Sequence, residues 1–76
     1  MTQVEQQQTT EPQIGARVRV PSVSETVYGC VVYWRAKARG TGFLVGVRFD
    51  TTVAHGGALI TKPLLVDWSN CEVRNG

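Results

Sequence analysis

The chain has 76 residues, of which 42% are hydrophobic and 18% charged, a composition typical of one small globular domain. Two cysteines exclude a disulfide framework, and a net charge of +2 is far below the dense positive charge of dedicated nucleic-acid-binding domains. The polar first thirteen residues lack the apolar segment of a secretory signal, and no apolar run approaches the roughly 20 residues of a membrane span. We therefore expect a cytoplasmic protein.

The first thirteen residues differ in composition from the rest of the chain. They contain Glu5 and Glu11, no basic residue, and one aliphatic side chain besides Met1. So little apolar surface does not offset the entropy of ordering the segment. We expect residues 1–13 to be a disordered tail, with a partner-binding arm as the alternative, and residues 14–76 to be the folded domain. That domain holds all eight basic residues and four of the six acidic ones, a balance of +4.

Two β-strands are predicted between residues 14 and 35. Apolar and polar residues alternate over Ile14–Val20, which is typical of a half-buried strand, and Pro21 ends it. Residues 27–35 are apolar on both faces, which indicates a central strand or one that a partner covers. Gly29 in this strand is the expected place of a bulge or a sharp bend.

A hairpin and a third strand are predicted next. Residues 36–42 contain two glycines and two basic residues, a composition typical of a hairpin loop. Alternation over Phe43–Phe49 places the odd-numbered side chains on one face and Leu44, Gly46 and Arg48 on the other. Asp50–Gly57 has no periodicity and is expected to be a flexible turn.

The last third of the chain contains two apolar patches on either side of Pro63. Because proline cannot donate to a ladder of hydrogen bonds, we expect a strand over Leu64–Trp68 and only a short preceding arm at residues 59–60. Residues 69–70 predict a tight turn, one turn of 3₁₀ helix, and Cys71–Arg74 predicts the final strand.

Together, these segments predict an all-β fold, a small five-stranded barrel, since closure removes strand edges that so short a sheet could not protect. An open sheet that completes its core in a dimer is the alternative. Cys30 and Cys71 both fall in predicted strands. We expect two buried, reduced thiols, with one bridge between them as the alternative.

No group of side chains predicts catalysis or metal binding. A triad drawn from Ser69, His55 and Asp67 lacks any spacing that indicates a base oriented by a second group. Cys30, Cys71 and His55 are three candidate ligands at no recognised spacing, whereas a structural zinc site takes four. We therefore expect no catalytic residue, no metal site and no cofactor, and we favour a binding module over a self-contained enzyme.

The apolar outer side of the second and third strands is the first candidate binding surface. If one face of each strand fills the barrel, the other leaves Val31, Tyr33 and Leu44 in water unless a partner covers them. Exposed apolar patches of this kind commonly mark protein interfaces. The alternative is that the segment from Ala58 to Pro63 folds over them.

The basic hairpin is the second candidate surface. Arg35, Lys37 and Arg39 lie on or beside it, Arg48 lies on the paired strand, and Tyr33 and Trp34 are adjacent. Basic groups interleaved with aromatic rings can hold phosphates and stack bases. The alternative is that the aromatic rings pack in the core while the charges keep the hairpin soluble.

The opening segment Ile14–Val20 resembles the first strand of many SH3-like small barrels, among them ribosome-associated KOW-type modules. The segment Val66–Val73 is similar to the last turn and strand of that superfamily. The resemblance covers about residues 14–74 in layout, and it implies a five-stranded SH3-like barrel.

Chain length, the polar head and the segment Gly15–Trp34 are similar to the plasmid-borne type II dihydrofolate reductases. These are SH3-like barrels that build one active pore from four subunits, so the resemblance implies an enzyme formed only on oligomerisation. The family's Val-Gln-Ile-Tyr run is replaced here by Ala58–Thr61, and Val20 and Pro21 stand where its functional lysine is expected. No active-site residue is therefore transferred to this chain.

The segments Gly29–Trp34 and Val45–Phe49 are similar to the last strand pair of PilZ domains, which bind cyclic di-GMP. Both ligand-binding motifs of that family are missing here. This resemblance therefore implies a strand pair and no ligand.

The sequence thus leads to three functional hypotheses. The first is a non-catalytic SH3-like barrel that binds protein, either another chain or itself, and we expect a homo-oligomer. Val31, Tyr33 and Leu44 would form the contact, and Arg35, Lys37 and Arg39 would steer an acidic partner. The second is a nucleic-acid-binding module that uses Arg35–Arg39 and Arg48, and the third is an oligomeric enzyme of the reductase kind.

Overall fold

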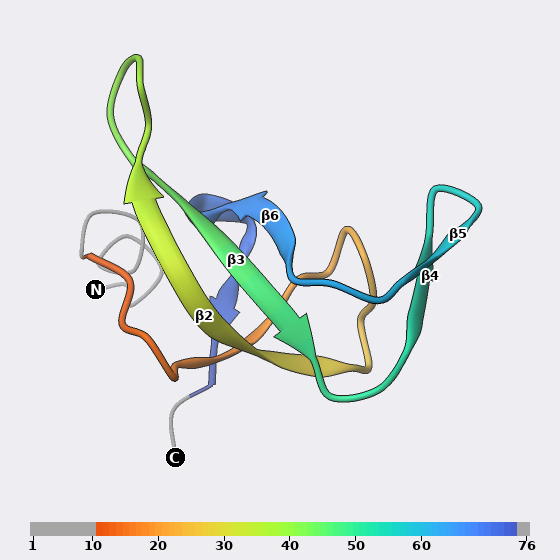
Figure 1. Ribbon diagram of the computed structural model, residues 1–76. Helices are drawn as coiled ribbons and strands as arrows, with labels where there is room; N and C mark the ends of the chain where they lie inside the picture. Colours follow the sequence, from red (N-terminus) through yellow and green to blue (C-terminus); the bar gives the residue numbers. More distant parts are fainter. Residues whose placement is uncertain (1–10, 75–76) are drawn as a thin grey trace.

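The computed structural model describes residues 11–74, and these form an all-β domain with one short 3₁₀ turn (Figure 1). No helix among these residues is long and apolar enough to cross a membrane. The elements in chain order are β1 (Arg17–Arg19), β2 (Tyr28–Ala36), β3 (Phe43–Phe49), β4 (Val53–His55), β5 (Ala58–Ile60), β6 (Leu64–Asp67), the 3₁₀ turn η1 (Trp68–Asn70) and β7 (Glu72–Val73).

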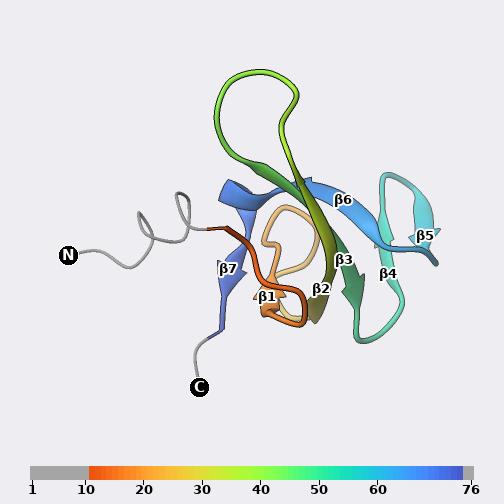
Figure 2. The same cartoon turned by 60° about the vertical axis from the view of Figure 1, so that its left-hand side comes forward.

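Five of the strands form one antiparallel sheet in the order β6-β3-β2-β1-β7. The first strand therefore lies between the second and the last, and Figure 2 shows β7 beside β1. The five strands predicted from the sequence correspond to these five, and the expected 3₁₀ turn is present immediately before β7. The turn begins at Trp68, so the predicted fourth strand ends one residue earlier than expected.

The core consists mainly of valine. Five side chains, Val18, Val20, Val31, Val45 and Val47, are completely buried, and Trp68 and Cys71 pack with them at the closing turn. Trp34, Phe43 and Phe49 cover this cluster from the side, and the rings of Trp34 and Phe43 meet edge to face with centroids 5.3 Å apart. The predicted inward face of the third strand is therefore confirmed.

The start of the first strand differs from the prediction. Ile14 is 61% exposed rather than half-buried, because the chain turns at this point and the strand begins only at Arg17. Residues 1–10 of the predicted tail lie outside the described residues. Of the other three, Pro12 is buried, and the carbonyl of Gln13 accepts a hydrogen bond from the amide of Ala16 at 3.0 Å.

The bulge expected at Gly29 lies three residues further along β2. Gly29 pairs regularly with Phe49, whereas the register between β2 and β3 shifts between Val31 and Tyr33, so that Val32 has no partner. An inserted residue of this kind exchanges the faces of all side chains beyond it.

Residues 50–57, expected to be a flexible turn, contribute a strand instead. Val53–His55 pairs with Ala58–Ile60 to form a separate two-stranded hairpin, which we call the arm (residues 53–60). Gly56 and Gly57 form its turn with φ angles of 65° and 82°, a conformation that glycine adopts without strain. The arm stands away from the five-stranded sheet, beyond the end of β3 (Figures 1 and 2).

Both cysteines are free thiols. Cys71 is buried next to η1, where removal from water raises the pKa of its thiol to about 12. At neutral pH the group is therefore a protonated, unreactive part of the core. Cys30 is half-buried on the opposite face of the sheet, and its thiol donates to the carbonyl of Val31 at 3.6 Å.

Candidate functional site

The outer face of β2, β3 and β6 carries the candidate site. In the cross-strand register, Tyr33 pairs with Gly46, which pairs with Leu65, and the next row joins Arg35, Leu44 and Asp67. Paired residues point to the same side of a sheet. Tyr33, Leu44 and Leu65 are therefore neighbours on one side, and we call these three residues the outer stripe.

The outer stripe differs from the predicted interface by one residue. Val31 was expected beside Tyr33, but it is completely buried in the core, because the bulge at Val32 puts Val31 and Tyr33 on opposite faces. Leu65 takes its place in the stripe. Tyr33 is 44% exposed and Leu65 41%, and Leu44 is half-buried in the next row. Leu65 lies in a strand that the sequence predicts, but the sequence does not indicate which face of the strand it occupies.

The ring of Tyr33 lies against Gly46, which has no side chain and separates Tyr33 from Leu65. A β-carbon added to Gly46 would lie 2.3 Å from Cε2 and 2.4 Å from Cζ of the Tyr33 ring. The ring therefore fills the space above the glycine, an arrangement known to stabilise glycine-containing strands. The contact fixes the aromatic surface that Tyr33 presents to solvent.

Two arginines stand at the two ends of the outer stripe. Arg35 lies two residues after Tyr33 in β2, at one end of the stripe. Arg48 lies two residues after Gly46 in β3, and because the strands are antiparallel it is at the other end. Both are exposed, and across residues 11–74 neither forms an ion pair. The apolar stripe is therefore bordered by unpaired positive charge.

Lys37 and Arg39, the other two residues of the predicted basic surface, do not lie at the ends of the outer stripe. Lys37 turns back to Asp67, with 2.5 Å between its Nζ and a carboxylate oxygen. Arg39 is exposed in the hairpin loop. The four basic residues of the predicted hairpin surface therefore do not form one continuous patch, since Lys37 is paired and the other three are spread over the loop and both ends of the stripe.

Asp67 joins the hairpin to the closing turn. Besides Lys37, it accepts hydrogen bonds from the amide and the hydroxyl of Ser69, at 3.0 and 2.8 Å, and so caps η1. The ion pair with Lys37 is the largest cause that holds the pKa of this carboxyl below its ordinary value, followed by the amide of Ser69.

The remaining arginines of the outer side are neutralised. Arg17 forms an ion pair with Asp50, and Arg19 forms one with Glu72. Hydrogen bonds in these pairs raise the pKa of each guanidinium and lower that of Asp50. Arg74 lies over the ring of Tyr28, 5.3 Å from its centroid. Among residues 11–74, the basic side chains without an ion pair are therefore Arg35 and Arg48 beside the outer stripe and Arg39, Lys62 and Arg74 elsewhere.

The residues considered for catalysis are not brought together. His55 lies at the turn of the arm, whereas Ser69 and Asp67 bond to each other at η1. Within the part of the chain that the structure describes, no three histidine, cysteine or acidic side chains gather as metal ligands.

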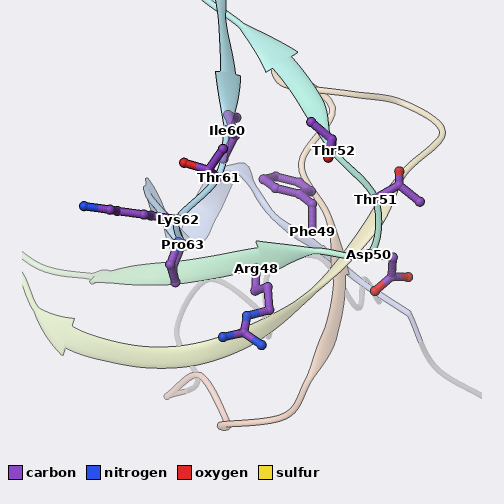
Figure 3. A pocket seen from close by; sticks show the side chains of 9 residues that line it. All are labelled: Arg48, Phe49, Asp50, Thr51, Thr52, Ile60, Thr61, Lys62 and Pro63. Atoms are coloured by element: carbon purple, nitrogen blue, oxygen red, sulfur yellow. The ribbon is translucent and has the colours of Figure 1, made fainter.

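A hollow of about 620 Å³ lies between the arm and the end of β3 (Figure 3). The ring of Phe49 points into it beside Ile60, whereas the basic groups of Arg48 and Lys62 point away from each other at its rim. The hollow therefore does not present converging positive charge to an anion. Its remaining lining comes from Asp50, Thr51, Thr52, Thr61 and Pro63.

The ion pair between Lys37 and Asp67 predicts that the stability of the fold depends on pH. Because the folded-state pKa of Asp67 is lowered, its stabilising effect is present above its unfolded pKa of about 3.9 and is lost as the pH falls through the folded value. Lys37→Met should raise the pKa of Asp67 and cost about 0.5–1 kcal/mol at neutral pH. Carboxyl-carbon NMR titration and urea unfolding measure both effects. Arg39→Met is the control, and an unchanged Asp67 pKa in Lys37→Met would contradict the assignment.

The contact between Tyr33 and Gly46 predicts a non-additive pair of substitutions. Gly46→Ala should cost about 1 kcal/mol, because the new methyl group displaces the ring. In a Tyr33→Ala background the same change should be neutral or stabilising, since nothing then occupies that space and alanine restricts the unfolded chain. Urea unfolding of the four proteins gives the coupling. Equal losses in both backgrounds would show that the ring does not lie on the glycine.

Comparison of the chain with models of protein families, with curated proteins and with solved structures finds no match. The surface that the fold builds therefore indicates what the protein can bind. Its features are the outer stripe, the two arginines that border it, and the arm.

Proposed function

We propose that this protein is a non-catalytic binding module that assembles with protein through the outer stripe. The observation that carries the proposal is the exposure of Tyr33 and Leu65 on either side of Gly46, in a domain whose largest completely buried side chains are valines. Large apolar side chains in contiguous exposed positions are typical of interaction surfaces. Covering them would add apolar burial that a chain of this size lacks.

We also propose that the fold is an SH3-like barrel. The order β6-β3-β2-β1-β7 supports this proposal, as does the 3₁₀ turn that returns the chain to pair with its first strand. Such barrels expose one side of a strongly bent sheet to solvent. The outer stripe occupies that side.

Arg35 and Arg48 restrict the charge of the partner that this surface can bind. Unpaired positive charges at the rim of an apolar patch accelerate encounter with acidic partners and disfavour positively charged ones. Lys37, which we expected to take part in this steering, is neutralised by Asp67. Arg39, the third residue expected to steer, is exposed in the hairpin loop rather than at an end of the stripe. We therefore propose that Arg35 and Arg48 steer the partner.

Nucleic-acid binding is the second candidate. Tyr33 lies between Arg35 and Arg48 along the strands, an arrangement in which a base can stack while both flanking phosphates are contacted. Leu44 and Leu65 fit this function less well, because aliphatic side chains offer neither stacking nor phosphate contacts. Affinity for a single-stranded oligonucleotide that falls steeply with salt would favour this candidate.

An enzyme assembled from several chains, as in the reductase family, stays a prediction. It requires that side chains from different copies meet at a shared pore. Binding of folate or nicotinamide by the purified assembly would support it.

Truncation within the outer stripe tests the proposed function. Tyr33→Ala and Leu44→Ala should each lower the association constant about tenfold, since central aromatic and apolar anchors carry most of the energy of an interface. Sedimentation at several protein concentrations, on nucleic-acid-free material, measures the change. Ile14→Ala is the control, because Ile14 is a large apolar side chain that is 61% exposed but lies outside the stripe. Association that responds to Ile14 and not to Tyr33 would refute the assignment.

A further inference from the structure

The structure leaves two apolar surfaces exposed, the outer stripe and the arm. Among residues 11–74, the exposed large apolar side chains are Ile14, Tyr33, Leu59 and Leu65. Two of them belong to the stripe and one, Leu59, to the arm. We propose that the arm of one copy of this chain docks on the outer stripe of a second copy. This inference rests on the proposed function and names the partner of the same surface.

Each face of the arm carries an apolar cross-strand pair, and His55, paired with Ala58 at the turn, is its polar side chain. Val53 pairs with Ile60, and this face turns inward, where Val53 is only 8% exposed and Ile60 lies beside Phe49 (Figure 3). Ala54 pairs with Leu59 on the other face, and Leu59 is 66% exposed. A two-stranded hairpin alone is at best marginally stable in water. The inner face therefore anchors the arm, and the outer face offers an uncovered leucine.

The arm cannot be explained as a cover for its own stripe. It projects beyond the end of β3, and Leu59, Tyr33 and Leu65 are all exposed in the same molecule (Figure 1). The alternative that the segment from Ala58 to Pro63 folds over the stripe is therefore not observed. A contact between the two surfaces requires a second chain.

Charge distinguishes this contact from a face-to-face dimer. If two stripes packed on each other, Arg35 and Arg48 of one copy would be enclosed with the same arginines of the other, and like charges brought together in this way are unfavourable. Asp67, the acidic residue in the next row, is already occupied by Lys37. The arm has no aspartate, glutamate, lysine or arginine in its eight residues. Its titratable side chain is the exposed imidazole of His55 at the turn, so the arm brings no fixed charge between the arginines.

The proposed contact joins two different surfaces. Two copies can make it twice, as a closed two-fold dimer in which each arm lies on the other copy's stripe, or once, head to tail, which leaves one arm and one stripe unused. Head-to-tail contacts continue into rings or chains. A short hairpin on a sheet face buries less area than the roughly 1,200 Å² at which stable interfaces begin. The expected association is therefore weak and reversible, and its average mass rises with concentration.

Two matched substitutions test the arm and the outer stripe one at a time. Leu59→Lys disables the arm, and Leu65→Lys disables the stripe. Both replace an exposed leucine, so both variants should fold, and urea unfolding verifies this. Each variant alone should lose at least about tenfold in association constant, measured by sedimentation from about 10 μM to about 1 mM protein. Leu59→Ser and Leu65→Ser repeat the comparison without added charge if a lysine variant unfolds.

Mixing the two variants is the decisive measurement. The intact arm of Leu65→Lys can dock on the intact stripe of Leu59→Lys, so an equimolar mixture should regain a 1:1 complex. That complex should not grow further, because its remaining arm and stripe are both disabled. Native mass spectrometry of the mixture, with one variant isotope-labelled, identifies the mixed pair.

The outcomes distinguish this inference from the proposed function. If Leu65→Lys abolishes association while Leu59→Lys associates like the unmodified chain, the stripe is used but the arm is not, and only the inference is overturned. If association is present and neither variant changes it, the proposed function is overturned as well. A chain that stays monomeric at about 1 mM overturns docking on a second copy.

The sign of the charge at residue 59 gives an independent test of the arginine border. Leu59→Glu should retain more association than Leu59→Lys, by about fivefold or more, because a carboxylate entering the stripe meets Arg35 and Arg48. The difference should shrink in high salt. Equal losses for both variants would show that the arm does not approach these arginines.

Discussion

One unpaired residue in β2 decides which side chains of the protein face the core. Before Val32 the odd-numbered residues of β2 point inward, and beyond it the even-numbered ones do. Val31 and Trp34 therefore both pack in the core, although regular alternation would separate them. Without the bulge, either Val31 would leave the core or Tyr33 and Arg35 would enter it, and burying a guanidinium without a partner is costly. The bulge thus creates the core and the outer stripe together.

The distribution of apolar residues around this core is unusual in one respect. The completely buried side chains are small and β-branched, whereas larger ones, Tyr33, Leu59 and Leu65, are exposed. β-Branched valine packs well on a pleated surface but removes less area from water than leucine or tyrosine. A small domain that buries valine and exposes leucine has a limited core and a sizeable reserve of apolar surface. An assembly function accounts for that reserve without requiring any catalytic group.

The strand segments could be predicted from the sequence because alternation and proline positions determine them locally. The face of Val31 could not, since a bulge depends on how two strands pair, and Gly29 was the more obvious position for it. Only residues 59–60 of the arm were expected, and its first strand was missed for a related reason: the three residues of β4 are too few to show a period. Leu65 was left without a face because it follows another leucine, so either register buries an apolar residue.

The arginines at the ends of the stripe have a consequence for specificity that the apolar residues alone do not provide. Tyr33, Leu44 and Leu65 would bind any apolar surface, including a second stripe, and such indiscriminate contacts lead to aggregation. Arg35 and Arg48 make that self-stacking unfavourable while leaving the centre of the stripe open. An apolar element that is uncharged or acidic can bind the stripe without being repelled by these arginines. The arm of the same chain is an element of the first kind, so the charges that prevent one form of self-association favour another.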